Sequence, residues 1–242
     1  MENSSTKAIS FGATILSIGL IVCTLIGGYF FYQARALDNV LSVTGSAKMD
    51  VTSDQVKWVT VITRPATAST LKAGYAQMNA DATLVKQFYT DNRIDPQTLT
   101  ISPVQMNEVY EQYASADKKY TLTQTFELDS TDIDGVTALS KNTESLIQKG
   151  VVASTQTFEY SYSKLPDLRV SLLADAVKDA RARANEIVSG TGQAVGKLKS
   201  ASSGVVQVLS PNSTDVSDYG SYDTGSIKKS IMVTVKATFS LK

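Results

Sequence analysis

The sequence predicts an α+β protein in which a mixed or antiparallel sheet is covered by helices and preceded by one transmembrane helix. Three observations carry this prediction. An uncharged apolar stretch lies near the N-terminus, several later segments alternate as strands do, and the segments between them repeat at the helical period. The predicted order after the apolar stretch is ββαββαβαββ. No domain-sized linker interrupts residues 37–242, so they are predicted to form a single domain.

The apolar stretch at residues 8–34 is predicted to be a transmembrane anchor helix, with residues 1–7 as a short tail before it. It contains no charged residue and is long enough to cross about 30 Å of hydrocarbon. Its last part, residues 29–32, is aromatic, as expected at the membrane interface. The lipid bilayer is therefore the first predicted partner of this chain.

Cleavage as a signal peptide is the alternative, because Ala34-Arg35-Ala36 has the small residues of a cleavage site. The length of the apolar stretch favours an uncleaved anchor, since signal peptides have apolar regions of about 7 to 15 residues. Lys7 and Arg35 flank the helix, so charge does not decide its orientation. The short tail favours a single-pass protein of the cytoplasmic (inner) membrane, whose C-terminal domain faces the periplasm or the cell exterior.

Small residues form a stripe along the predicted anchor. Gly12, Gly19, Cys23 and Gly27 recur at steps of seven and four residues, which places them on one face of a helix. Such stripes let two membrane helices approach closely, so these residues are candidate contacts for self-association. The alternative is that small residues are simply common in membrane helices.

Composition argues against several classes of function. The 23 Lys and Arg residues balance the 23 Asp and Glu residues without a run of like charge, so nucleic acid is not a predicted partner. Histidine is absent, which removes the commonest general base and zinc ligand. The only cysteine, Cys23, lies in the apolar stretch. We therefore predict a protein that is not an enzyme, with no catalytic residue, no cofactor and no metal site.

The first half of the domain is predicted to contain four strands and one helix. Two β-branched runs between residues 37 and 64 are followed by an amphipathic helix that ends near Asn92, with Thr67 or Ser69 as its N-cap. The alternating segments 98–110 and 118–130 then predict a hairpin.

The second half is predicted to contain two helices and three strands. A helix opens at Thr131 or Asp132 and stops at Gly150, and a strand follows it. Another helix begins near Pro166, and two strands separated by a flexible loop at 210–226 complete the chain. The face of that last helix is narrow enough to lie close against a sheet; it comprises Leu172 or Leu173, Ala176, Ala180, Ala184, Ile187 and Val188.

Tyrosines mark two of the predicted loops. Tyr110 and Tyr113 lie at the tip of the hairpin, and Tyr219 and Tyr222 lie in the loop at 210–226. An exposed tyrosine is a plausible contact for a partner because its ring is apolar while its hydroxyl stays hydrated. The alternative is that these rings pack against strands of their own domain.

Two acidic pairs have a spacing that could form a metal or acid–base site. Asp175 and Asp179 share a helix face, but Lys178 and Arg183 lie within helical reach and predict ordinary surface ion pairs. Glu108 and Glu111 lie in the hairpin tip without a histidine or cysteine nearby as a supporting ligand. Neither pair is predicted to hold a metal.

Several stretches together resemble the SIMPL-domain family, which includes the bacterial YggE-like proteins. The resemblance covers residues 38–242 and is carried by residues 146–202, by VTGSAKMDVTSDQVKW at 43–58 and by VTVKATFSL at 233–241. It implies an exported or membrane-attached α/β-type domain that can form oligomers, in some members large rings, with a link to oxidative stress. The family supplies no agreed catalytic residues, so none is assigned.

Two hypotheses for function follow. The first is a self-associating structural or scaffold component on a membrane anchor, linked to envelope or oxidative stress, with a homo-oligomer as its assembly. The alternative is an extracytoplasmic module that binds a protein partner or a small ligand through the loops 108–120 and 210–226.

Overall fold

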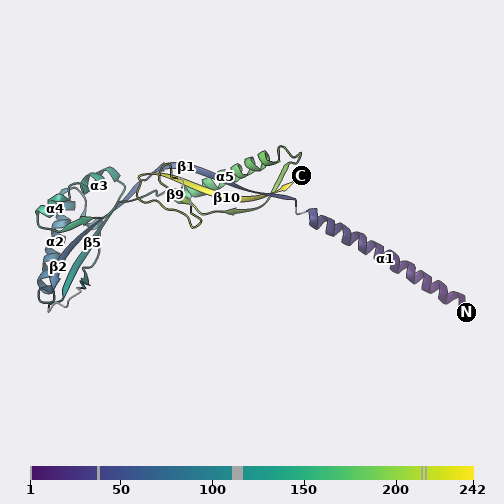
Figure 1. Cartoon of the computed structure of the whole chain (residues 1–242), viewed down its shortest axis with the longest axis horizontal. Coiled ribbons are helices and arrows are strands. Elements are labelled where there is room, and N and C mark those ends of the chain that lie inside the picture. The colour runs from purple at the N-terminus through teal and green to yellow at the C-terminus, as the bar shows by residue number, and fades with distance from the viewer. Residues whose placement is uncertain (1, 37–38, 111–116, 214, 216) are drawn as a thin grey trace. The chain divides into compact units, whose positions relative to one another are not determined.

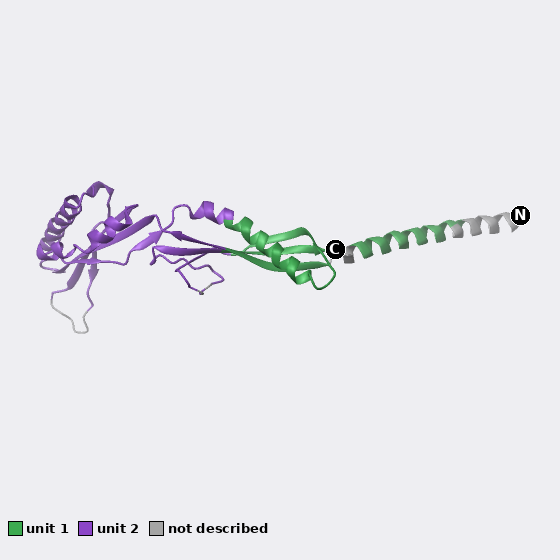
Figure 2. Cartoon of the chain, turned by 90° about the horizontal axis from the view of Figure 1, so that it is seen from above, with its two compact units in different colours: residues 1–47, 172–204, 233–242 green, residues 48–171, 205–232 purple. Residues whose placement is uncertain are grey.

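The computed structural model describes residues 2–36, 39–110, 117–213, 215 and 217–242, and it divides into two compact units (Figure 2). Unit 1 comprises Met1–Ala47, Leu172–Gly204 and Val233–Lys242, and unit 2 comprises Lys48–Ser171 and Val205–Met232. The structure has the predicted α+β class, with antiparallel strand pairing. The single domain over 37–242 stays a prediction.

A long helix, α1 (Glu2–Ala36), forms the N-terminal part of unit 1. Within it, Ile15–Gln33 is long and apolar enough to cross a membrane, with a mean hydropathy of 2.0. None of this segment is buried by the rest of the described chain. A helix with no protein around its apolar surface suits a membrane anchor or a signal sequence, and both remain open.

The rest of unit 1 is a small sheet with one helix. Strand β10 (Lys228–Leu241) lies between β1 (Val40–Thr52) and β8 (Val195–Ser203), and the helix is α5 (Leu165–Val188) (Figure 1). The boundary with unit 2 falls inside β1, α5 and β10. The predicted helix near Pro166 and the predicted final strand are therefore confirmed.

Small side chains allow α5 to lie directly on β1. Ala176 and Ala180 are fully buried, and a Cβ added to Gly45 would lie only 2.2 Å from the carbonyl oxygen of Ala176. The close approach expected from the alanine face is thus confirmed. The prediction is wrong for one residue of that face. Ile187 is 56% exposed, because it lies near the end of the helix and beside the alanine stripe, not on it.

Unit 2 is built on a six-stranded antiparallel sheet. Its two long central strands are β2 (Gln55–Thr67) and β5 (Lys119–Ser130), which pair along their whole length. Shorter strands flank them: β3 (Thr100–Ile101) and β4 (Gln105–Glu108) pair with β5, and β6 (Ala153–Thr155) and β7 (Glu159–Ser161) pair with β2. The strand predicted at 98–110 is thus two short strands, and so is the strand predicted after Gly150.

Helices pack on one side of this sheet. They are α2 (Leu71–Asp91), the 3₁₀ turn η1 (Pro96–Thr98), α3 (Ile133–Ser140) and α4 (Glu144–Gln148). The predicted cap at Asp132 is confirmed, since its side chain accepts the N–H of Gly135 at 2.9 Å. The predicted caps of α2 are wrong: Thr70 occupies that position, while the hydroxyls of Thr67 and Ser69 bond to each other at 2.9 Å.

Aromatic residues and one ion pair fill the interior of unit 2. Trp58 is fully buried, and its ring lies 5.7 Å from the ring of Tyr89. Arg64 forms two hydrogen bonds with Asp81, at 2.6 and 2.9 Å, and so ties β2 to α2. This hydrogen bonding raises the pKa of Arg64, and the pair leaves no uncompensated charge beside the core.

Candidate functional site

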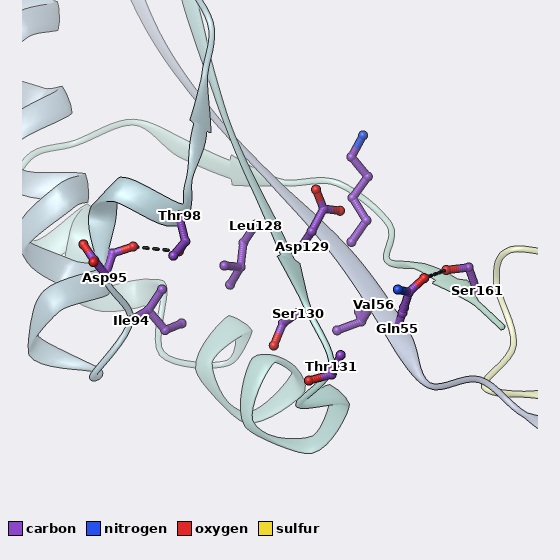
Figure 3. Close-up of a pocket in the computed structure, with 11 residues that line it drawn as sticks. Gln55, Val56, Ile94, Asp95, Thr98, Leu128, Asp129, Ser130, Thr131 and Ser161 are labelled. Atoms are coloured by element: carbon purple, nitrogen blue, oxygen red, sulfur yellow. Dashed lines mark hydrogen bonds between the residues drawn. The ribbon is translucent and has the colours of Figure 1, made fainter. Parts of the chain in front are cut away.

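A shallow hollow of about 580 Å³ lies where β2 and β5 meet the turn after α2 (Figure 3). Ile94 and Asp95 come from that turn, Leu128 and Asp129 from the end of β5, and Gln55 from the start of β2. Strand pairing fixes these positions, because β2 and β5 keep register up to the pair of Val56 with Ser130. The hollow is open to solvent and mixes apolar and carboxylate side chains.

A second hollow of about 540 Å³ adjoins the first, since Gln55 and Thr131 line both. Its wall includes Asp54, whose carboxylate accepts the N–H of Ser163 at 2.7 Å and the hydroxyl of Ser163 at 2.6 Å. The bond from that hydroxyl holds the pKa of Asp54 below its ordinary value. We call the two hollows together the acidic groove.

The loop between β9 (Gln207–Leu209) and β10 is held by a buried glutamine. Gln207 is 5% exposed, and its side chain donates to the carbonyl of Ser217 at 2.6 Å and accepts the N–H of Ser221 at 2.8 Å. Backbone bonds join Val208 to Ser221 and to Asp223. The loop predicted to be flexible is therefore tied to β9 along its second half.

A buried lysine holds the other end of the same loop. Lys229 is 1% exposed and donates to the carbonyl of Asp223 at 2.5 Å, while the Asp223 carboxylate accepts the hydroxyl of Ser226 and the N–H of Gly225. Burial lowers the pKa of Lys229, against the attraction of Asp223. Burial also acts to raise the pKa of Asp223, but the bonds from Ser226 and Gly225 outweigh it and leave that pKa lowered.

The predicted tyrosines are placed unequally. Tyr219 is 97% exposed and Tyr222 is 52% exposed, both on the loop held by Gln207. Tyr110 is 91% exposed at the end of β4, and Tyr113 lies outside the described residues. Three of the four predicted tyrosines are therefore exposed.

The predicted membrane stripe is open along α1. A Cβ added to Gly12, Gly19 or Gly27 would meet nothing within 4 Å, and Cys23 is exposed. The four residues share a helix face, as their spacing requires. Their role in self-association stays a prediction.

The acidic residues on α5 are paired as predicted. Lys178 lies 2.9 Å from Asp175 and Arg183 lies 2.8 Å from Asp179. In the hairpin, Glu108 pairs with Lys118 at 3.0 Å, and Glu111 falls outside the described residues. Among the residues the structure describes, no group of three or more Asp, Glu, His or Cys side chains is placed to hold a metal ion.

Comparison with known families decides where the chain belongs. Residues 41–239 match the SIMPL family, described as a protein of unknown function (DUF541). The chain belongs to the SIMPL family. No curated protein matches it. The SIMPL match reaches from β1 to β10 and so spans both compact units. It confirms the resemblance drawn from residues 38–242, whereas the link to oxidative stress and the formation of rings stay predictions.

The sequence analysis did not identify the buried polar residues beneath the loop at 210–226 and beside the acidic groove of this SIMPL protein. Lys229, Ile231 and Val233 are two residues apart along β10 and so lie on the same side of the strand. The alternation could therefore have predicted that Lys229 is buried. Gln207 and Ser53 carried no such signal, because each is an isolated polar residue whose burial depends on segments distant in sequence.

Proposed function

We propose that this SIMPL protein is a membrane-tethered, extracytoplasmic binding module that acts by contact with a protein partner and not by catalysis. One observation carries the proposal: the loop that exposes Tyr219 and Tyr222 is held by the buried side chains of Gln207 and Lys229. Helix α1 supplies the tether, through its apolar segment Ile15–Gln33.

Gln207 and Lys229 hold this loop at Ser217 and Asp223, and its composition suits recognition. Residues 210–226 are rich in Ser, Asp, Gly and Tyr, which combine aromatic contact area with adaptable hydrogen bonding. A loop that is already ordered loses less conformational entropy when a partner binds. Its aromatic rings then offer a large contact area with few rotatable bonds. Tyr219 is the central contact in this proposal.

Site-specific crosslinking in cells tests the proposal. We expect p-benzoylphenylalanine in place of Tyr219 to give a discrete crosslinked product in the native membrane, whereas the same group in place of Val170 gives none. Val170 is a suitable control because it is also exposed, at 69%. Changing Gln207→Ala should weaken the crosslink from position 219, since it releases the loop while leaving both tyrosines in place. Absence of any product from position 219 would contradict the proposal.

Self-association is the second candidate function, and it is supported by the open stripe on α1 and by β8. This strand lies at an edge of its sheet, and its residues from Lys197 onward are exposed. The mass of the full chain in detergent tests it: we expect an oligomer that Gly19→Ile with Gly27→Ile weakens and that Leu20→Ile does not. A strictly monomeric wild type excludes it.

A further inference from the structure

The two compact units differ in charge, although the chain as a whole is neutral. Residues 39–47, 172–204 and 233–242 of unit 1 contain seven Lys and Arg residues against three Asp and Glu residues, a surplus of four positive charges. Unit 2 contains 14 Lys and Arg residues against 18 Asp and Glu residues. The positive surplus therefore belongs to the unit that directly follows the apolar helix α1.

Three lysines of unit 1 lie on the face of its sheet that points away from α5. Lys236 lies on β10 between two residues that pack beneath α5, so its side chain points to the opposite face. Lys197 and Lys199 flank Leu198 on β8. Leu198 pairs with Phe239, which also packs beneath α5, so the two flanking side chains share the face of Lys236. We call this surface the lysine face.

The charges of the lysine face are exposed and unpaired. Lys197, Lys199 and Lys236 are all exposed, and none of them forms an ion pair with a residue that the structure describes. Lys178 on α5 differs, because it lies 2.9 Å from Asp175. The strand segments 40–47, 195–203 and 233–241 contain no Asp or Glu, so no carboxylate of the sheet competes for these ammonium groups.

Hydroxyl groups lie between these lysines. The hydroxyls of Ser42 and Thr238 bond to each other at 2.8 Å across β1 and β10, and Thr238 pairs with Ser200 on β8. The Ser240 hydroxyl accepts the N–H of Lys197 at 3.0 Å. Hydroxyl and ammonium groups are both donors to phosphate oxygens. The lysine face therefore has the charge and the donors that suit a surface of phosphate groups.

The lysine face begins close to the end of α1. The candidate span ends at Gln33 and the helix at Ala36, and three further residues, which cover at most about 11 Å, lead to Asn39. There the carbonyl of Asn39 accepts the N–H of Leu241 at 2.9 Å, and Leu241 pairs with Val195 at the start of β8. This end of the sheet thus lies within about 16 Å of the level of Gln33.

We propose that the lysine face lies on the anionic lipid headgroups of the bilayer that α1 crosses. Lys197, Lys199 and Lys236 bind the lipid phosphates, and the hydroxyls between them donate to the same oxygens. Each lysine near an anionic surface is expected to favour the contact about fivefold, and three together roughly a hundredfold. The inference rests on the tether of the proposed function and adds the class of lipid and the face in contact.

Energy transfer from the domain to labelled lipids tests the proposal. The full chain with Cys23→Ser and Ser202→Cys carries a fluorophore beside Lys236, since Ser202 is exposed and pairs with Lys236. We expect transfer to be several-fold higher in vesicles of phosphatidylcholine with phosphatidylglycerol than in phosphatidylcholine alone. It should fall as NaCl rises from about 0.05 M to about 0.5 M, because salt screens the attraction. Equal transfer in both kinds of vesicle would overturn the proposal.

Two matched variants locate the contact. Lys199→Glu reverses one charge of the lysine face and should weaken the contact with the mixed vesicles about tenfold or more. Lys178→Glu makes the same change of charge on α5 and should behave as the wild type does, since Lys178 is exposed on the helix and not on the lysine face. Unchanged transfer in Lys199→Glu, or an equal loss in the two variants, would overturn the assignment to this face.

Flotation of the vesicles after an alkaline carbonate wash separates this inference from the tether. We expect the wild type and Lys199→Glu to remain with both kinds of vesicle, because α1 holds them whatever the lipid charge. Loss of the wild type from the vesicles would overturn the tether and this inference together. Retention of the chain with equal transfer in both kinds of vesicle would overturn the lipid contact alone.

Discussion

The two compact units solve the packing of a helix on a sheet in opposite ways. In unit 1, α5 lies on the sheet through alanines and through Gly45, so backbone atoms almost touch. In unit 2, large rings fill the space between α2 and the sheet, with Trp58 and Tyr89 at the centre. The first arrangement has no room to add atoms, and the second cannot lose them. This contrast predicts different sensitivities to mutation.

Removing the central ring of unit 2 should give the largest effect. Trp58 is fully buried and contacts Tyr89 and Phe158, so Trp58→Ala is expected to lower the free energy of unfolding by about 3 to 5 kcal/mol. Hydrogen exchange of the amides of β2 and β5 measures it. Tyr219→Ala, at a 97% exposed position, should change stability by less than about 0.5 kcal/mol. A cost below about 1 kcal/mol for Trp58→Ala would show that this core tolerates a cavity.

Adding a single methyl group to unit 1 should give the next largest effect. In Gly45→Ala the new Cβ would lie 2.2 Å from the carbonyl oxygen of Ala176 and 2.3 Å from the nitrogen of Ala180. Backbone atoms cannot move aside as side chains do, so we expect a loss of about 3 kcal/mol, seen as faster hydrogen exchange along α5. Gly190→Ala has open space and is the control. If α5 exchanges at the wild-type rate in Gly45→Ala, helix and sheet are less tightly packed than described.

Alkaline pH should act on unit 2 through Tyr89. Burial raises the pKa of Tyr89 from its ordinary 10.0 to about 12, against a hydrogen bond with Thr60 that lowers it. Because the folded pKa is the higher one, this contribution is present below about pH 10 and is lost as pH rises toward 12. At about 1.4 kcal/mol per pKa unit, the free energy of unfolding should fall by roughly 2 to 3 kcal/mol over this range.

Denaturant unfolding at pH 8 and at about pH 11 measures this loss. Tyr89→Phe should make the stability less dependent on pH, whereas Tyr110→Phe should not, since Tyr110 is 91% exposed. The sheet and α5 of unit 1 contain no tyrosine, so amides there should keep their protection over the same range. Equal loss of protection in both units would contradict the assignment to Tyr89.

Much of the fold could be predicted because it depends on local patterns. The alanine face of α5, the cap at Asp132 and the long strands of the sheet each follow from spacing within one segment. The predictions that erred concern the ends of elements. Thr70, not Thr67 or Ser69, precedes α2, and Ile187 leaves the buried face near the end of α5. End positions depend on neighbouring chain segments more than on periodicity.

The candidate surfaces depended on contacts between distant segments. The exposed tyrosines at 219 and 222 were named from composition alone, but composition indicated a flexible loop. Its restraint by Gln207 and Lys229 depends on two strands that bring both side chains beneath the loop. The acidic groove was not predicted, because Asp54, Asp95 and Asp129 are far apart in the chain and are brought to one groove by the pairing of β2 with β5 and by the turn after α2.

The sequence by itself determined the apolar N-terminal helix, the α+β class and membership of the SIMPL family, because length, periodicity and motif similarity are properties of the chain alone. Only the tertiary structure decided which polar side chains are buried and which carboxylates gather in one groove. Burial is set by what packs against a residue, and for Ser53, Gln207 and Lys229 those neighbours come from elsewhere in the chain.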